Sequence, residues 1–389
     1  MIYVGIDVSK YKHDCCIVSS DGEIIESDMI VTNDADGFTL LESRLSNLAR
    51  EDSIKIGFEA TGHYCINLKL FLEKNHHSFM ELNPLLLKQF IKSHSLRRTK
   101  TDSIDCQVIA RYLMTVEYKP YPTEFYHMYC LKSLTRMREK MIRQRSRYLV
   151  QMTNVLDHMF PEFKPFFNGR FSEASLYLLE KYGTPEAISR ITLKTYNKIH
   201  DLTRGRFNLE KYHTLKRLAK NTIGESNKVY ELELKTLLEL YRFVNVRIQR
   251  FDEEISQYMS VLNPMILTIP GIGMTSAACI IAEYGDISRF SGSAAMLSFA
   301  GMEPGYYQSG TSEYEGHMVK RGSSYLRCAI YNVCLPLVNS NPVFSEYYHK
   351  KREEGKPYKV AISHVAKKLI RVIYALETQH IPYDPEKCR

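Results

Sequence analysis

The hydrophobic pattern of the first 125 residues is that of short strands alternating with helices. Residues 2–7 form an apolar run, and the turn Ser20-Asp21-Gly22 separates two strand-like runs within residues 13–31. Strands are then expected at 54–60 and 78–83, and helices at 36–50, at 63–74, from 84 and at 99–114. Strands followed by strand–helix alternation predict a mixed α/β domain over residues 1–125.

The pattern becomes helical over residues 126–262. Apolar residues from Leu134 to Met159 line one helix face, and arginines cover the others. The clearest periodicity is a 3–4 spacing over four heptads, at Leu234, Leu237, Tyr241, Val244, Ile248, Phe251, Ile255, Tyr258 and Leu262. This spacing is typical of a coiled-coil seam, but a face packed against the preceding methionine-rich helix would produce the same pattern. Residues 165–224 match neither period and are a candidate insertion.

Residues 263–389 form a third segment, which we expect to be mainly helical. It opens with "IPGIGMTSAACIIAEYG", a Pro-Gly-x-Gly turn between apolar helices that resembles a helix-hairpin-helix. Backbone N–H groups at Gly271 and Gly273 could hold a DNA phosphate there, although such turns are common without a ligand. No Gly-Lys-Ser/Thr follows, so the turn is not a P-loop.

Length and charge refine this picture. A chain of 389 residues predicts two or three domains, and 44% hydrophobic with 25% charged residues indicates a globular protein. The formal net charge is +8, and residues 86–160 alone hold 14 Lys and Arg against 6 Asp and Glu. Such a local excess suits a polyanion, with Arg97, Arg98 and Lys100 as candidate nucleic-acid contacts, or it is simply a solvated face.

Cysteine usage and hydropathy indicate a cytoplasmic protein. The nine cysteines are scattered, without a CxxC pair or a zinc-ligand spacing, which is typical of a reducing compartment. The chain begins with "MIYVGID", which lacks the features of a signal peptide. No apolar run approaches the roughly 18 residues of a membrane helix, so no membrane partner is expected.

Four carboxylates stand out by position. Asp7 and Glu59 each end a predicted buried strand, and Asp102 and Asp105 are three residues apart on a predicted helix, on one face. Together they could converge in one pocket, where their mutual repulsion would require a cation. Oxygen-only ligands suit Mg²⁺ or Mn²⁺. Each carboxylate taken alone is better explained as a cap, a turn residue or a surface charge.

Five segments, in this order, resemble the motifs of the IS110 family of insertion-sequence transposases, which are relatives of the Piv DNA invertase. They are "GIDVSKYKHDCCIV", "FEATGHY", "KTDSIDCQVIARY", "IPGIGMTSAACIIAEYGDISRF" and "PGYYQSGTSEYEGHMVKRGSSYLR". The resemblance covers roughly residues 1–115 and 263–375. It implies a RuvC-like domain of ribonuclease-H fold, a central helical coiled coil, and a C-terminal transposase domain in a prokaryotic, nucleoid-associated enzyme.

The resemblance also implies a set of site residues. A DEDD tetrad would consist of Asp7, Glu59, Asp102 and Asp105, holding Mg²⁺ or Mn²⁺. The nucleophile would be Ser309 of "QSG", selected over nearby serines by its Ser-Gly context, and it would form a covalent phosphoserine with DNA. Donor and target DNA are the implied partners, and some members of the family also use a noncoding bridge RNA.

Elementary chemistry agrees with that assignment. A serine hydroxyl is a poor nucleophile unless a base or a metal lowers its proton affinity. Lys320 and Arg321 could offset phosphate charge, and Gly310 would let the backbone approach DNA closely. Because the carboxylates and the serine lie some 200 residues apart, the two parts must meet within one chain or between protomers. The coiled coil favours a homo-oligomer, either a dimer or a tetramer.

Other functions use the same residues differently. A metal-dependent nuclease or junction resolvase would activate water at the carboxylates and leave Ser309 only to bind phosphate. An actin-like sugar kinase also opens with a strand ending in Gly-x-Asp, but no second glycine-rich phosphate turn follows here. A non-catalytic nucleic-acid-binding protein would explain the basic helices and leave the tetrad without a role.

Overall fold

The computed structural model divides the chain into two compact units, Met1–Tyr129 and Cys130–Arg389. The structure describes residues 1–50, 52–60, 62–94, 102–121, 125–309 and 312–388. Each unit has its own hydrophobic core, and each is described by itself below.

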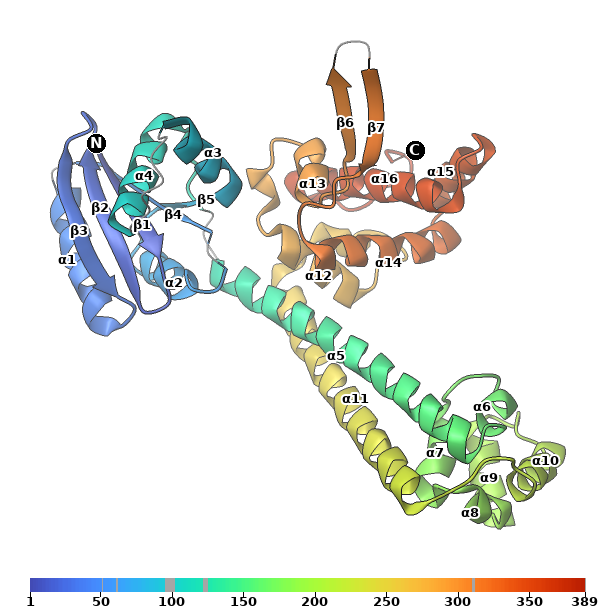
Figure 1. Ribbon diagram of the computed structural model, residues 1–389. Helices are drawn as coiled ribbons and strands as arrows, with labels where there is room; N and C mark the ends of the chain where they lie inside the picture. Colours follow the sequence, from blue (N-terminus) through green and yellow to red (C-terminus); the bar gives the residue numbers. More distant parts are fainter. Residues whose placement is uncertain (51, 61, 95–101, 122–124, 310–311, 389) are drawn as a thin grey trace. The chain divides into compact units, whose positions relative to one another are not determined.

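The first unit is built on a five-stranded sheet with the order β3-β2-β1-β4-β5 (Figure 1). β1, β2 and β3 are antiparallel neighbours, whereas β4 and β5 run parallel to β1. The mixed α/β prediction is confirmed. The elements are β1 (Ile2–Val8), β2 (Lys12–Ser19), β3 (Ile24–Thr32), α1 (Ala35–Ala49), β4 (Ile54–Glu59), α2 (Ile66–Lys74), β5 (Phe79–Leu82), α3 (Pro84–His94) and α4 (Asp102–Thr115).

The two faces of this sheet are covered differently because successive residues of a strand point to opposite sides. Val4 and Ile6 of β1 belong to a core that also contains Leu41 of α1 and Leu68 of α2. On the other face, α4 packs on β1, β2 and β4. The central strands β1 and β4 are therefore covered on both sides, and their ends can offer polar groups to a ligand, whereas the edge strand β3 is largely exposed.

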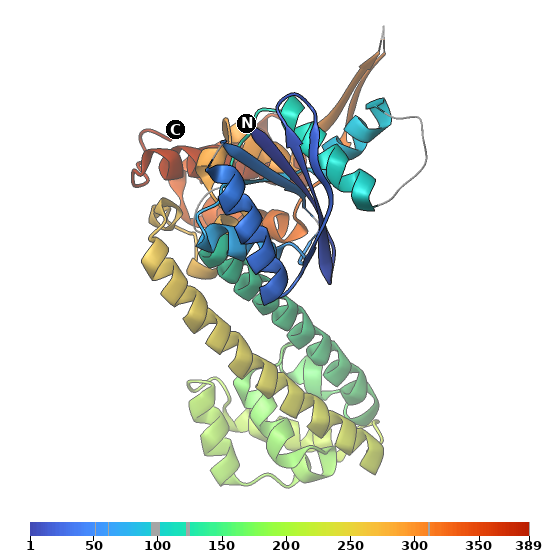
Figure 2. The ribbon, with the colours of Figure 1, turned by 90° about the vertical axis from the view of Figure 1, so that its left-hand side faces the viewer.

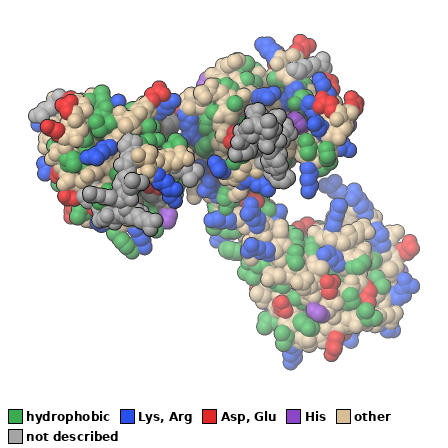
Figure 3. Space-filling view, turned by 45° about the horizontal axis from the view of Figure 1, so that its top comes forward, with side chains coloured by type: hydrophobic (Ala, Val, Ile, Leu, Met, Phe, Trp, Pro, Cys, Tyr) green, Lys and Arg blue, Asp and Glu red, His purple; other side chains and the backbone are tan. Residues whose placement is uncertain are grey.

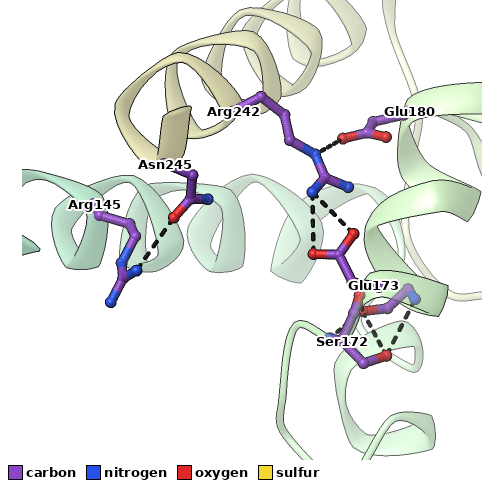
Figure 4. Close-up of polar contacts among 7 residues, drawn as sticks. Arg145, Ser172, Glu173, Glu180, Arg242 and Asn245 are labelled. Atoms are coloured by element: carbon purple, nitrogen blue, oxygen red, sulfur yellow. Dashed lines mark hydrogen bonds and ion pairs between the residues drawn. The ribbon is translucent and has the colours of Figure 1, made fainter. Parts of the chain in front are cut away.

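Two long helices dominate the second unit. α5 (Phe125–Met159) leads into it from the first unit, and α11 (Lys228–Leu262) has the same length of 35 residues. The two helices extend side by side in both ribbon views (Figures 1 and 2). Arg138 of α5 forms an ion pair with Asp252 of α11, and Arg145 Nη1 donates to Asn245 Oδ1 at 3.2 Å (Figure 4). These contacts define an antiparallel helical arm.

The segment without a clear sequence pattern folds as a module of short helices at the far end of the arm (Figure 1). Its core includes Leu179, Ile188 and Leu215, packed with Met152 of α5 and Leu234 of α11. Arg242 of α11 binds Glu173 and Glu180 of this module, close to the Ser172 cap (Figure 4). The helices are α6 (Phe163–Phe166), α7 (Glu173–Tyr182), α8 (Pro185–Ser189), α9 (Leu193–Leu202) and α10 (Leu209–Lys220).

The predicted coiled-coil seam is used within the chain. Leu234 and Leu237 are buried in the module's core together with Met159 of α5. Further along, Val244, Ile248 and Ile255 are also buried, and no seam residue is exposed, so the intrachain interpretation accounts for the seam. A second apolar set on α11 is exposed: Val229, Leu232, Phe243 and Val246.

The remainder of the second unit is mainly helical, as expected, and it also contains two antiparallel strands, β6 and β7, which form a hairpin. The element before Gly271 is a single 3₁₀ turn, so the expected helix-hairpin-helix has one regular α-helix, α12. The elements are η1 (Met265–Thr268), α12 (Met274–Tyr284), η2 (Ile287–Arg289), α13 (Ser293–Phe299), β6 (Pro304–Ser309), β7 (Ser312–Met318), α14 (Ser324–Ser340), α15 (Pro342–Glu353) and α16 (Tyr358–Gln379).

Among the described residues, no helix combines the length and the apolar character needed to cross a membrane.

Candidate functional site

Asp7 and Glu59 lie next to each other on the central strands. β1 and β4 are parallel neighbours in which Ile6 is paired with Phe58, so the next residue on each strand is one of the two carboxylates. Asp7 has the same strand parity as Gly5, and Glu59 the same as Gly57, so both side chains belong to one face of the sheet. Both residues are half-buried.

That face is the one covered by α4, the helix that carries Asp102 and Asp105. A Cβ atom on Gly5 would lie 2.3 Å from the carbonyl oxygen of Cys106 and 2.4 Å from the amide nitrogen of Ala110, so the helix backbone rests directly on β1. Asp105 immediately precedes this contact and is half-buried. α4 begins at Asp102, whose side chain is outside the described part. The structure thus brings three of the four predicted carboxylates, and the helix bearing the fourth, to one face of the sheet.

Asp14 is a further carboxylate at this site that the sequence reasoning missed. It lies opposite Asp7 in the antiparallel register of β1 and β2, and therefore on the same face. Two neighbouring carboxylates repel each other, and Lys12 Nζ, 3.1 Å from Asp14 Oδ1, offsets part of that repulsion. A two-residue turn at Lys10-Tyr11 would have predicted this pairing, because it places residue 7 opposite residue 14.

Carboxylate oxygens on one face are the donor type that Mg²⁺ and Mn²⁺ prefer. Within the described side chains, no three His, Cys, Asp or Glu stand close enough to hold a metal ion, and Asp102 is not part of that set. The donors are thus of the type that a hard divalent cation prefers, but the described side chains do not by themselves assemble a ligand set.

Ser309 is the last residue of β6 and is paired through its backbone with Ser312 of β7. It stands at the tip of the hairpin, in the second unit, whereas the carboxylates belong to the first. Its side chain lies outside the described part, as does Gly310. Arg97, Arg98 and Lys100 also fall outside the described residues.

Lys320 and Arg321 are exposed at the base of this hairpin. The base is tightly built: a Cβ atom on Gly301 would lie 1.9 Å from the carbonyl oxygen of Arg321, and Gly301 has φ +65. Lys320 also has a positive φ of 54, and its amide donates to Gly301 O at 3.0 Å. Arg327 Nη1 donates to the carbonyl oxygens of Ala300 and Gly322, both at 3.1 Å. The orientation of the strands at their base is therefore fixed by α13 and α14.

Gly271 and Gly273 differ in whether their position needs a glycine. Gly271 has φ +99, and a Cβ atom there would lie 2.6 Å from Ser340 Oγ, so the turn needs glycine. Gly273 caps α12 without a side chain, and a Cβ atom there would meet nothing within 4 Å. Only Gly273 leaves a helix N-terminus open to an approaching group.

A buried carboxylate near the hairpin base was also missed. Glu283 of α12 has a side chain only 1% exposed, and Arg136 of α5 donates to it from Nε at 2.5 Å and from Nη2 at 2.9 Å. Burial acts to raise the pKa of Glu283, but the bonds from Arg136 and the charge of Lys132 hold it below the usual value. No local pattern signals this pair, because residues 136 and 283 are 147 positions apart.

Comparison with known proteins defines the class. Residues 4–161 match a transposase family model of the IS110 DEDD type, and residues 263–349 match the model described as "Transposase IS116/IS110/IS902 family". The chain is 24% identical over 386 residues to an uncharacterised 44.8 kDa protein of insertion element IS116 from Streptomyces clavuligerus, covering 96% of this chain and 94% of that protein.

Two further relatives span almost the whole chain. The pilin gene-inverting protein of Moraxella bovis is 24% identical over 394 residues, covering 98% of this chain and 97% of that protein. A mini-circle putative transposase for IS117 from Streptomyces coelicolor is 21% identical over 394 residues, with coverages of 97% and 94%. These matches define a DNA-recombining enzyme of the transposase class. The chain belongs to the IS110 family of insertion-sequence transposases.

Proposed function

We propose that this transposase cuts and rejoins DNA through a temporary serine–phosphodiester, made by Ser309 at a divalent-metal site in the first unit. The observation that supports it most is the common face of Asp7 and Glu59 beneath α4. The strand order β3-β2-β1-β4-β5, with three antiparallel and two further parallel strands, supports a ribonuclease-H-like, RuvC-like fold for that unit.

In this proposal Asp7, Glu59, Asp102 and Asp105 hold Mg²⁺ or Mn²⁺. The bound ion would supply charge stabilisation at phosphate and lower the proton affinity of a hydroxyl. Asp14 lies on the same face and adds negative potential, which Lys12 moderates. Removing either Asp7 or Glu59 would therefore weaken both cleavage and metal affinity.

The step assigned to Ser309 is an exchange of ester bonds. Its Oγ forms a bond to phosphorus, the DNA ester bond breaks, the serine proton is released, and the freed DNA hydroxyl takes up a proton. A hydroxyl on a second DNA end then attacks the phosphoserine and regenerates the enzyme. Because one phosphodiester replaces another at each step, the reaction needs no external energy source. Lys320 and Arg321 at the hairpin base, and the α12 N-terminus at Gly273, would bind phosphate.

The carboxylates and Ser309 belong to different units, so the proposal requires that the units meet within one chain or between protomers. We assign a homodimer or homotetramer associated through α11, acting on donor and target DNA. A noncoding bridge RNA is the further partner that membership of the family suggests.

The nucleophile is tested by trapping DNA on the protein. With labelled DNA and Mg²⁺, a covalent adduct should survive denaturing electrophoresis, and both adduct and strand transfer should be lost in Ser309→Ala. Ser312→Ala is the matched control, because Ser312 is the backbone partner of Ser309 in the same hairpin. Cleavage by Ser309→Ala without an adduct would instead identify a nuclease that activates water at the same carboxylates.

A further inference from the structure

One face of α5 carries a row of cations. Between residues 132 and 147 this helix contains seven Lys and Arg and a single acidic residue, Glu139. Arg138 and Arg145 contact Asp252 and Asn245 of α11. The other five follow a 4-4-3-4 spacing, which places them within about 80° of arc on one helix face. We call this set the basic ridge: Lys132, Arg136, Lys140, Arg143 and Arg147.

The first end of the ridge is anchored by a buried charge. Arg136 makes its two hydrogen bonds to Glu283, and Lys132 Nζ lies 3.6 Å from the same carboxylate. Burial lowers the pKa of Lys132, and the positive charges of Arg136 and Arg289 act in the same direction. The single carboxylate of Glu283 therefore faces several cations. It fixes the position of this end of the ridge but does not cancel the positive charge of the ridge.

The ridge also meets the base of the hairpin. Tyr325, in the first turn of α14, lies with its ring centroid 5.0 Å from the guanidinium of Arg136 and 5.6 Å from that of Arg143. Ser323, the N-cap of the same helix, follows Gly322 of the hairpin base. A polyanion lying on the ridge would thus be led toward Lys320 and Arg321.

The outer part of the ridge is open to solvent. Lys140, Arg143 and Arg147 are exposed, and the ion pair found for Arg143 is the surface contact with Glu139 four residues earlier. Figure 3 shows Lys and Arg side chains gathered along the long helices near the C-terminal helices. The ridge is about 22 Å long, which matches roughly six phosphates along one strand of a duplex.

We propose that the basic ridge binds the phosphodiester backbone of duplex DNA and guides it to the base of the hairpin. Charge complementarity selects a polyanion, and the spacing of the cations suits a regular phosphate backbone. This inference rests on the proposed function only in that the hairpin carries the reactive serine. DNA and RNA share the phosphate chemistry, so the experiment must separate them.

The test compares two triple substitutions with the same change in charge. The first is Lys140→Gln with Arg143→Gln and Arg147→Gln. The matched control, Arg190→Gln with Lys194→Gln and Lys198→Gln, removes three exposed cations of the distal module. Binding of labelled duplex DNA, single-stranded DNA and RNA of random sequence is measured by fluorescence anisotropy at several salt concentrations, and thermal unfolding verifies the fold of each variant.

We expect the ridge triple to bind duplex DNA about tenfold more weakly than the wild-type chain, with the salt slope reduced by about 0.9 for each lost contact. The control triple should retain most of the binding. A loss confined to single-stranded DNA or RNA would overturn the assignment to duplex DNA.

Equal losses in both triples would overturn the inference, because only net charge would then matter. Displacement of DNA by polyglutamate at equal charge concentration would overturn it too. Ser309→Ala should bind as the wild type does, because binding needs no chemistry. If Ser309 is not the nucleophile, the binding measurement is unaffected. If the ridge does not bind DNA, the adduct assay still tests Ser309.

Discussion

At the scale of single residues, two contrasting kinds of polar side chain in the first unit are at least half-buried: carboxylates near strand ends and a histidine in the core. Asp7 and Glu59 are half-buried at strand ends, where they can meet a cation. His13 on β2 is different: it is fully buried and stacks with Phe38, and neither ring nitrogen has a hydrogen-bond partner among the described residues. The carboxylates are therefore placed to bind a ligand, whereas the buried His13 ring, unpaired within the described part of the chain, lowers the stability of the fold.

His13 should make stability depend on pH. Burial lowers its pKa below the ordinary value of 6.5, so the folded state favours the neutral ring. That stability is fully present above about pH 6.5 and is lost as the pH falls below it toward the lowered pKa. His13→Phe should stabilise the first unit by roughly 1 kcal/mol and flatten this dependence.

Urea unfolding at about pH 7.5 and about pH 5.5 measures the difference. His200→Phe provides a comparison, because His200 Nδ1 has the carbonyl oxygen of Phe207 as a partner at 2.8 Å. The same pH dependence in wild type and His13→Phe would show that other groups control acid stability.

At the scale of elements, close backbone packing positions the helix and the strands that carry the proposed site residues. α4 can carry Asp102 and Asp105 across the sheet only because Gly5 leaves no side chain between β1 and the helix backbone. On the hairpin side, Gly301 and Gly322 perform the same role for β6 and β7, each with positive φ and a neighbouring carbonyl within 2.2 Å of its Cβ position. In both places a glycine outside the proposed reacting groups determines how the elements that carry those groups pack.

Gly5→Ala should therefore displace α4. Its Cβ would meet backbone atoms, which cannot rotate away, so we expect a loss of about 1–3 kcal/mol and a fall in DNA cleavage larger than the stability change alone explains. Gly292→Ala, where a Cβ would meet nothing within 4 Å, should leave both unchanged. Calorimetry and a cleavage assay measure the two effects, and full cleavage by Gly5→Ala would contradict this account.

At the scale of the whole molecule, the proposed mechanism requires that carboxylates and serine from separate units come together. The α11 seam is already buried within the chain, from Leu234 and Leu237 to Ile255. Association through α11 must then use its other apolar set, Val229, Leu232, Phe243 and Val246, which is exposed. Although the set is interrupted between Leu232 and Phe243, its members lie within about 100° of one helix face, where a partner helix could pack.

Substitution of Phe243 and Val246 by Lys should therefore weaken self-association while the far-UV circular dichroism stays unchanged. Sedimentation velocity over a concentration series would show a shift toward monomer, and strand transfer should fall with it. Ile223→Lys, at an apolar residue of the distal module that is still more exposed, is the control. An unchanged oligomer in the double variant would assign association to another surface.

The sequence alone determined the parts of this protein that depend on local order. Apolar runs ending at Asp7 and Glu59, and the helix that begins at Asp102, predicted the strands and helix of the first unit because side-chain periodicity reports burial directly. The ordered motifs predicted the family, which the comparisons confirm.

Features that depend on contacts between distant residues become visible only in the folded chain. The register of β1 and β2 places Asp14 beside Asp7, and the bond from Arg136 to Glu283 joins residues 147 positions apart. Residues 165–224 gave no readable period because their helices are short and bury side chains on several sides. The periodicity of apolar residues shows which side of a helix or strand is buried. It does not show which other element packs on that side, because that element can come from anywhere in the sequence.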